Sequence, residues 1–259
     1  MTFFFIIRCM IHKTLDDFLD NNNDHLICYI VSNFDGFNLV KNCLLSAQKS
    51  NVSIVLFALD EEIAEEISKL FEIDIVLFLV GIDKNQTYKY GTFEWIDIVY
   101  NRYFIAHRLM KDGRNIVYMD TDVVIMKDFT KNIKRKLRNH QIVIQTNGNN
   151  CCTGFFAMRS CPELIWFFSR KKMTEKNYRS YGGNGGPSDQ KFFNAFIGSD
   201  MEKYQCVFLE RELYPNGQYY YDYNEEIEQK CFIIHFNCIQ GEVKKIKRMK
   251  MYQKFYLDL

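Results

Sequence analysis

The chain has 259 residues, of which 47% are hydrophobic and 25% are charged, and its formal net charge is +1. These proportions are typical of a folded globular protein and exclude an intrinsically disordered or low-complexity chain. The balanced charge also gives no reason to expect a nucleic-acid partner.

The first third of the chain alternates buried strands with amphipathic helices. A short acidic helix or arm at 15–24 comes first, and helices at 37–48 and 61–71 have apolar residues at helical spacing. This alternation is typical of an α/β fold with a mostly parallel sheet and helices on both faces. The strands that we expect between these helices lie at 26–31, 52–59 and 73–80.

The remainder of the chain continues the alternation. We expect strands at 116–119, 123–126, 141–145, 152–158 and 231–236, and helices at 93–110, 131–138, 162–172, 189–197 and from 242 onward. Ser188 is expected to cap the helix that follows it. The glycine-rich stretch 181–187 predicts a mobile loop, and 213–222 predicts a turn with an aromatic tail. With no Pro- or Ser-rich linker, we expect one domain at 26–259 after an N-terminal arm at 1–25.

Two carboxylates mark the end of one predicted strand. Asp120-Thr121-Asp122 is the only Asp-x-Asp in the chain, and apolar runs precede and follow it. Unpaired carboxylates are costly to bury at such a place, and their oxygens suit Mg²⁺ or Mn²⁺. A polar turn after a strand needs no metal ion, so the motif alone leaves a purely structural role open.

A second group of chemically useful residues follows the last predicted strand. His235 ends that strand and could supply a nitrogen ligand to the ion held by the two carboxylates. Gly241 would let the backbone approach a phosphate, and Lys244 or Lys245, near the start of a basic helix, would offer a charge to a diphosphate. A lone histidine at a strand end is also a common structural residue, which is the competing interpretation.

These motifs appear in the order found in a known enzyme family. They are Ile30–Asn33, Tyr118–Val124, Thr153–Phe156, Ser188–Gln190, Leu213–Gly217 and His235-x-Asn237-x-x-x-Gly241-x-x-Lys244-Lys245. In them the chain resembles the retaining nucleotide-diphospho-sugar transferases that include plant rhamnogalacturonan xylosyltransferases and related arabinosyltransferases. The resemblance spans about residues 26–250. It implies a single Rossmann-like GT-A domain and a metal-dependent glycosyltransferase that moves a sugar from a nucleoside diphosphate, UDP by family likeness, to a glycan or protein acceptor.

The resemblance also implies roles for individual residues. Asp120, Asp122 and His235 would bind Mn²⁺ or Mg²⁺, which would neutralise the diphosphate leaving group. Lys244 would contact the diphosphate, with Lys245 as the second choice. Ser32, Asn33 and Arg102 would contact the nucleotide.

The donor sugar would lie near a separate set of residues. Asp189 and Gln190 would face it, and Thr153 and Gly154 would border the sugar or the acceptor. Retention of configuration needs either a nucleophile on the far face of the sugar or attack from the face of departure. Glutamine is a poor nucleophile, so we favour same-face attack with the diphosphate as base, and a covalent adduct on Asp189 is the alternative.

The nine cysteines include no Cys-x-x-Cys pair, and most lie in apolar runs. We expect them to be reduced and mostly buried, as in a reducing compartment, with Cys151-Cys152 as an exception in a polar loop. Residues 1–7 are too short for a membrane span or a secretory signal, and no later run is long enough for a span. We therefore expect a cytoplasmic protein of a protist, a bacterium or a large virus.

Three other functions remain open at this point. A haloacid dehalogenase-type phosphohydrolase also ends a strand with Asp-x-Asp, but normally after its first strand, and at least three strands precede it here. A sugar nucleotidyltransferase would need a glycine-rich, arginine-bearing loop after the first strand, which 32–36 does not supply. A non-catalytic sugar-nucleotide-binding module would not need the full set of ligand-type residues.

Overall fold

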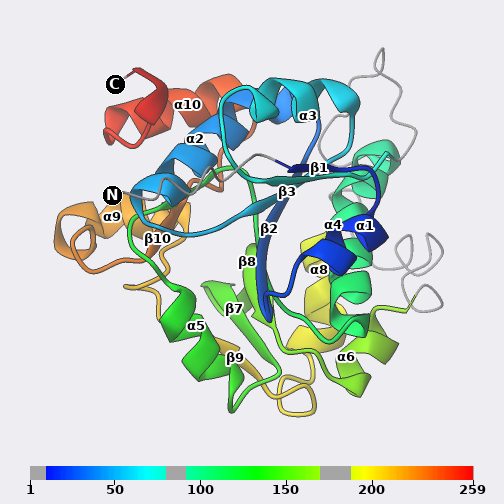
Figure 1. Ribbon diagram of the computed structural model, residues 1–259. Helices are drawn as coiled ribbons and strands as arrows, with labels where there is room; N and C mark the ends of the chain where they lie inside the picture. Colours follow the sequence, from blue (N-terminus) through cyan, green and yellow to red (C-terminus); the bar gives the residue numbers. More distant parts are fainter. Residues whose placement is uncertain (1–9, 80–91, 170–187, 259) are drawn as a thin grey trace, which may run out of the picture.

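The computed structural model describes residues 10–79, 92–169 and 188–258, and the glycine-rich loop expected at 181–187 lies outside these ranges (Figure 1). Within them, eight strands form one sheet in the order β1-β4-β3-β2-β5-β8-β7-β9. Neighbouring strands are parallel except at β8, which is antiparallel to both β5 and β7. The predicted mostly parallel α/β sheet is therefore confirmed. The strands are β1 (Met10–His12), β2 (Leu26–Ser32), β3 (Val55–Ala58), β4 (Asp74–Leu77), β5 (Asn115–Met119), β7 (Ile142–Asn147), β8 (Asn150–Met158) and β9 (Cys206–Phe208).

Helices cover both faces of the sheet. Since alternate side chains of a strand point to opposite faces, Ile27 and Tyr29 of β2 join one core cluster and Cys28 and Ile30 join the other. The first cluster lies under α1 (Leu15–Asn21), α4 (Phe93–Lys111), α6 (Pro162–Phe167) and α8 (Asp189–Phe193). The second lies under α2 (Phe37–Lys49), α3 (Glu61–Ser68) and α5 (Thr130–Leu137). In the described ranges, no helix is both long and apolar enough to cross a membrane.

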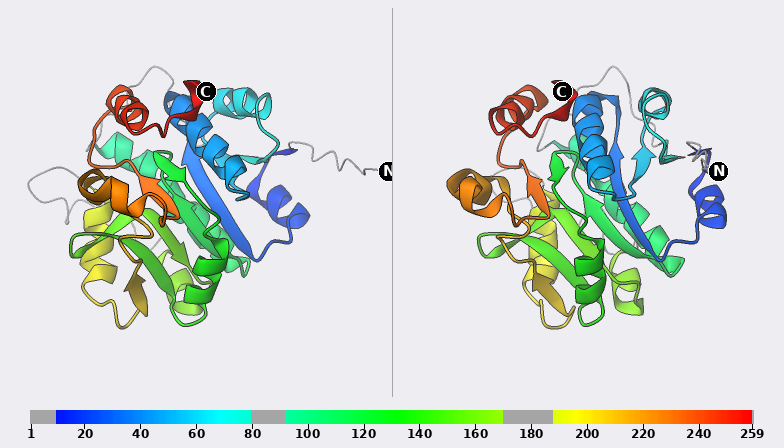
Figure 2. Two further views of the ribbon diagram at one scale, coloured as in Figure 1. Left: turned by 90° about the vertical axis from the view of Figure 1, so that its left-hand side faces the viewer. Right: turned by 60° about the vertical axis from the view of Figure 1, so that its left-hand side comes forward.

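The C-terminal part of the chain forms a third apolar cluster beside α2. Its members come from β6 (Val123–Ile125), β10 (Ile233–His235), α9 (Gly217–Ile227), α10 (Glu242–Met251) and the segment after α10. Figure 2 shows α9, β10 and α10 in orange and red, with the red C-terminal segment beside α2 in blue. Strands β6 and β10 pair with each other in an antiparallel two-stranded sheet, apart from the main one.

Several expectations about local structure were wrong. Strands β1 and β9 were not predicted, because three residues are too few to show a period of two. Residues 217–227 form a helix where a turn with an aromatic tail was expected. Cys151 and Cys152 are buried in β8 and do not lie in a polar loop. Ser188 precedes α8, but its side chain makes no cap hydrogen bond.

Two further elements modify the expected pattern. The helix expected at 189–197 is α8 followed by a π-helical turn, Asn194–Gly198, and a short 3₁₀ helix, Phe34–Gly36, follows β2. The N-terminal residues that the structure describes take part in the fold, since β1 pairs with β4 and Phe18 of α1 is fully buried.

Candidate active site

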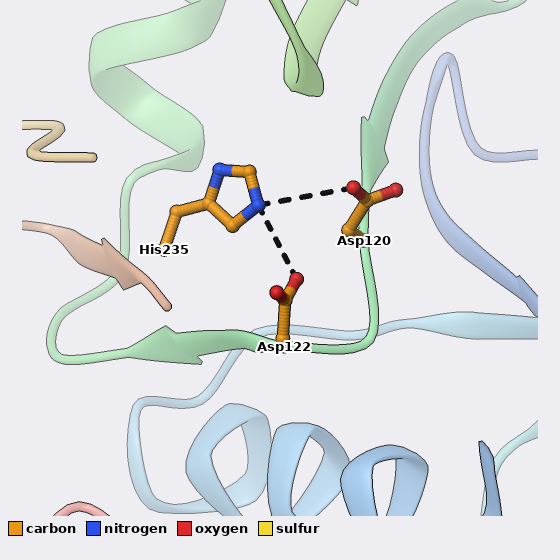
Figure 3. Close-up of side chains that lie close together, drawn as sticks. All are labelled: Asp120, Asp122 and His235. Carbon is orange, nitrogen blue, oxygen red and sulfur yellow. Dashed lines mark ion pairs between the residues drawn. The ribbon is translucent and has the colours of Figure 1, made fainter. Parts of the chain in front are cut away.

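Three predicted metal ligands lie together where β5 ends. A nitrogen of His235 and one carboxylate oxygen each from Asp120 and Asp122 lie within 4.8 Å of one another. His235 Nε2 is 3.2 Å from Asp122 Oδ1 and 3.8 Å from Asp120 Oδ2. Figure 3 shows the imidazole edge pointing at both carboxylates. The donor set, two carboxylate oxygens and one imidazole nitrogen, is one that Mn²⁺ accepts.

The backbone brings these residues together from distant parts of the sequence. The chain leaves β5, turns through Asp120 and Asp122, and enters β6, which pairs with β10 so that His235 lies opposite Val123. Phe236 N donates to Asp122 O at 3.0 Å, and Asp120 N donates to Gly154 O at 2.8 Å. The β6–β10 pair therefore fixes the histidine next to the two carboxylates.

Gly154 is required by the closeness of this packing. A Cβ atom at this position would lie 2.1 Å from His235 Cε1 and 2.7 Å from both His235 Nε2 and Asp120 Oδ2. Any side chain on β8 at this point would displace the imidazole. The predicted place of Gly154 at the site is therefore observed, for a steric reason that the sequence did not reveal.

The other ring nitrogen of His235 is held by a buried glutamine. Gln145 Oε1 lies 2.7 Å from His235 Nδ1, and Cys152 Sγ lies 3.7 Å from the same nitrogen. Nε2 is buried and makes no hydrogen bond of acceptable geometry to any described residue. A buried nitrogen that faces two carboxylates without a hydrogen bond is what a metal ligand would look like before its ion is added.

Charge at the site favours a cation on Nε2. Burial, the largest single effect, lowers the pKa of His235, but the adjacent Asp122 carboxylate and Cys152 side chain together hold that pKa well above its usual value. Burial likewise raises the pKa of Asp122, yet Lys245 and His235 together hold it well below its usual value. The carboxylate therefore stays ionised, and a divalent cation could replace the proton on the imidazole.

Two cationic side chains each occupy one oxygen of a ligand carboxylate. Arg102 Nη1, on α4, lies 2.9 Å from Asp120 Oδ1, and Lys245 Nζ, on α10, lies 2.7 Å from Asp122 Oδ2. Tyr118 also donates its hydroxyl to Asp120 Oδ1, at 2.6 Å. The remaining oxygen of each carboxylate faces His235. The protein thus orients both carboxylates with their second oxygens toward one point.

Asp189 is connected to Asp120 through Arg102. Arg102 Nη2 lies 2.9 Å from Asp189 Oδ2, and Tyr103 donates its hydroxyl to the same oxygen at 2.8 Å. Arg102 and Asp189 are both buried. One guanidinium therefore bridges Asp120 and Asp189 with separate nitrogens, a geometry that a lysine could not reproduce.

A cleft of about 670 Å³ lies over this network. Among the described residues, it is lined by most of the predicted site: Asn33, Arg102, Asp120, Asp122, Thr153, Gly154, Asp189, Gln190, His235, Gly241 and Lys245. Gly241 adopts φ +87°, a conformation that favours glycine, just before α10.

Two predicted contact residues do not reach the cleft lining. Ser32 is buried, and its hydroxyl donates to Asn33 O at 2.9 Å. Lys244 is exposed, whereas its neighbour Lys245 lines the cleft and pairs with Asp122. The geometry thus favours the second choice, Lys245, for the contact with a diphosphate, because consecutive helical residues point about 100° apart.

Sequence reasoning missed three residues that support the site: Tyr103, Tyr118 and Gln145. Tyr118 precedes Asp120 by two residues, so the period of a strand predicts the same face, and this signal could have been used. Gln145 is a polar residue that directly follows the apolar run 142–144, which is also a usable signal. Only the tertiary structure could pair Tyr103 with Asp189.

Comparison with known proteins identifies the family. Residues 50–249 match the family model described as nucleotide-diphospho-sugar transferase. UDP-galactose:fucoside alpha-3-galactosyltransferase of Dictyostelium discoideum is 23% identical over 201 residues, which is 69% of this chain but 31% of that protein. This chain therefore spans less than a third of that relative. UDP-D-xylose:L-fucose alpha-1,3-D-xylosyltransferase MGP4 of Arabidopsis thaliana is 20% identical over 265 residues, 93% of this chain and 72% of that protein.

Solved structures support the fold. The galactosyltransferase LgtC, in complex with donor and acceptor sugar analogues, aligns with a TM-score of 0.58 at 10% identity, over 88% of this chain and 94% of that one. Mouse xyloside xylosyltransferase 1 aligns with a TM-score of 0.53 at 13% identity, over 82% of this chain and 98% of that one. The family match also removes the phosphohydrolase alternative. The chain belongs to the nucleotide-diphospho-sugar transferase family, and its fold is that of the GT-A structures.

Proposed function

We propose that this protein transfers a sugar from a UDP-sugar to a fucose-bearing acceptor, with retention of anomeric configuration and with Mn²⁺ or Mg²⁺ bound to Asp120, Asp122 and His235. Two relatives with different donors, UDP-galactose and UDP-D-xylose, are both named for transfer to fucose and for α-linked products. Fucose is therefore the substrate feature that these two relatives share. The expected cytoplasmic location stays a prediction.

The convergence of three ligand atoms within 4.8 Å in the cleft carries the proposal. The two carboxylate oxygens that face His235 would repel an anionic diphosphate, and a divalent cation between them and the phosphates would remove that repulsion. A divalent cation there would stabilise the negative charge that develops on the departing diphosphate. Lys245 lines the same cleft and could add a second positive charge to the phosphates.

The surroundings of Asp189 support attack from the face of departure. Its Oδ2 accepts from both Tyr103 and Arg102, and the side chain is buried. A carboxylate paired in this way is a weakened nucleophile, because its charge is already stabilised in the ground state. Asp189 and Gln190 would then orient the donor sugar, and the diphosphate would accept the proton of the attacking hydroxyl.

The test is a transfer assay with UDP-galactose, UDP-xylose and UDP-glucose as donors, methyl α-L-fucoside as acceptor, and added Mn²⁺. We expect one donor to give an α-linked disaccharide, identified by NMR. Asp122→Asn should lower the rate at least 100-fold, on the order of 3 kcal/mol of lost charge stabilisation. The matched control is Asp128→Asn, at an exposed residue whose Oδ1 caps Thr130 and whose replacement keeps a capping group.

Four results would count against parts of the proposal. The absence of both transfer and hydrolysis for every UDP-sugar would contradict the donor class. A β-linked product would contradict retention. Equal rates for the Asp122 variant and the wild type would contradict the metal site. A glycosyl adduct on Asp189, found by mass spectrometry, would replace same-face attack with a covalent mechanism.

A further inference from the structure

The motif Leu213–Gly217 carries no ligand of the proposed site, yet it lies against His235. Gln145, which is fully buried on β7, donates from Nε2 to Tyr214 O at 3.0 Å. Its other amide atom, Oε1, lies 2.7 Å from His235 Nδ1. The carboxamide therefore connects this motif to the imidazole.

The orientation of the Gln145 amide is determined by its partners. A backbone carbonyl only accepts hydrogen bonds, so the NH₂ group must face Tyr214 and the carbonyl oxygen must face His235. An oxygen at 2.7 Å from a ring nitrogen requires a proton on that nitrogen. In the neutral ring the proton is therefore on Nδ1, and the lone pair of Nε2 points at Asp120 and Asp122.

The same motif also holds the backbone of His235. His235 N donates to Pro215 O at 3.2 Å, and Asn216 forms a β-bridge with His235. Asn216 in turn donates from Nδ2 to Thr146 O at 3.1 Å, on the strand that carries Gln145. Both the ring and the main chain of His235 are thus fixed by β7 and 213–217.

We propose that Gln145, oriented by the Tyr214 carbonyl, is a positioning residue that holds His235 in the tautomer able to bind the metal ion through Nε2. The inference deepens the proposed function and rests on its metal site. Partners that orient a metal-binding histidine in this way typically change metal affinity about 10–100-fold when removed. A purely structural glutamine would instead affect only the stability of the fold.

The experiment measures Mn²⁺ affinity from the EPR signal of free Mn²⁺, and the melting temperature without metal, for the full chain and three variants. Gln145→Met keeps the length of the side chain but removes the acceptor, so we expect Mn²⁺ to bind at least about tenfold more weakly. Gln145→Glu keeps an acceptor for Nδ1–H but loses the donor to Tyr214, so we expect a lower melting temperature with Mn²⁺ affinity within about threefold of wild type. Gln141→Met, at a matched buried glutamine directly before the same strand, should leave the Mn²⁺ affinity unchanged.

The outcomes separate this inference from the proposed function. If the wild type binds Mn²⁺ and Gln145→Met binds it equally well, Gln145 is not a positioning residue, while the metal site stands. If both Gln145 variants lose affinity in proportion to their melting temperatures, the role is structural and the inference is wrong. If the wild type itself does not bind Mn²⁺, with or without UDP, the metal site is wrong and the inference with it.

Discussion

At the scale of single residues, the geometry of the site depends on which carboxylate oxygens are paired with cationic side chains and which face His235. Asp120 and Asp122 each give one oxygen to a cationic side chain and turn the other toward His235. The sequence singled out three residues that the structure brings together, because carboxylates after an apolar strand and a histidine at a strand end are costly to bury alone. It could not rank Lys244 against Lys245, because that choice depends on how α10 is rotated against the cleft.

Lys245 and Lys244 form a natural pair for a test. Lys245 neutralises Asp122, so Lys245→Met should strengthen Mn²⁺ binding without nucleotide, because the ion no longer competes with the ammonium group. The same change should weaken UDP binding in the presence of Mn²⁺ by roughly tenfold or more, since a charge-assisted contact is lost. Titration calorimetry measures both affinities.

Lys244→Met is the control, since it removes the same charge from an exposed position one residue away. We expect both affinities to change less than about threefold, given the weak, screened effect of an exposed charge. A larger loss of UDP affinity for Lys244→Met than for Lys245→Met would restore the order of preference that the sequence suggested.

Gly154 gives a second prediction at this scale. Gly154→Ala would place a methyl group 2.1 Å from the original position of His235 Cε1, so the imidazole must move. We expect Mn²⁺ affinity to fall at least about tenfold and the free energy of unfolding to fall by about 1–3 kcal/mol, as for other overpacked sites. Urea unfolding and EPR of free Mn²⁺ measure the two quantities.

Gly148→Ala serves as the comparison. It lies in the turn between β7 and β8 and has φ +65°, and a Cβ atom added there would meet nothing within 4 Å. Alanine there costs stability through backbone strain, on the order of 1 kcal/mol, and should leave Mn²⁺ affinity unaltered. Similar Mn²⁺ affinities for the two alanine variants would mean that the contact with His235 is unimportant.

At the scale of elements, β6, β10 and α4 organise the site. The β6–β10 pair brings together two residues from distant parts of the chain, Asp122 and His235, which no local pattern could have placed side by side. Helix α4 was predicted at nearly its observed length, because its apolar residues recur with the helical period. The contacts of its polar residues were not predictable, because Arg102 pairs with Asp120 after β5 and with Asp189 on α8.

Removing the guanidinium from α4 should destabilise the fold. Arg102→Met would leave Asp120 and the buried Asp189 without their shared cation, so we expect a loss of about 3–5 kcal/mol in the free energy of unfolding. Arg108→Met is the control on the same helix. It breaks a more exposed pair with Asp16 and should cost less than about 1 kcal/mol. Equal losses in urea unfolding would show that the Arg102 bridge does not stabilise the fold.

At the scale of the whole molecule, hydrogen bonds connect α2, near the start of the chain, to the segment after α10, near its end. Asn42 of α2 is fully buried, donates from Nδ2 to Lys254 O at 3.0 Å, and accepts from Tyr256 N at 2.6 Å. These bonds hold the segment after α10 against α2. Because α10 carries Lys245, the position of this lysine in the site depends on α2, a helix in the first fifth of the chain.

Asn42→Ala should therefore weaken the whole fold and not only its C-terminal end. We expect a loss of about 2 kcal/mol, since two buried backbone groups lose their partner. The two tryptophans, in α4 and α6, lie in helices on the opposite face of the sheet from α2, so their fluorescence reports on a distant region. The urea unfolding transitions followed by fluorescence and by far-UV circular dichroism should both shift to lower urea concentration, by the same amount.

Gln48→Ala, at an exposed position of the same helix, should change the free energy of unfolding by less than about 0.5 kcal/mol. If the Asn42 variant shifts the circular dichroism transition but not the fluorescence transition, the C-terminal layer unfolds on its own. The two ends of the chain would then not form one cooperative unit.

The sequence by itself determined the fold class, most helices and strands, and the three proposed metal ligands. Those features follow from the spacing of apolar residues and from the chemistry of side chains that are costly to bury alone. Only the tertiary structure decided that Lys245 and not Lys244 lines the cleft, that Gly154 must lack a side chain, and that the Gln145 amide lies between His235 and Tyr214. Such choices depend on distances between elements far apart in the chain, and these distances are set by packing.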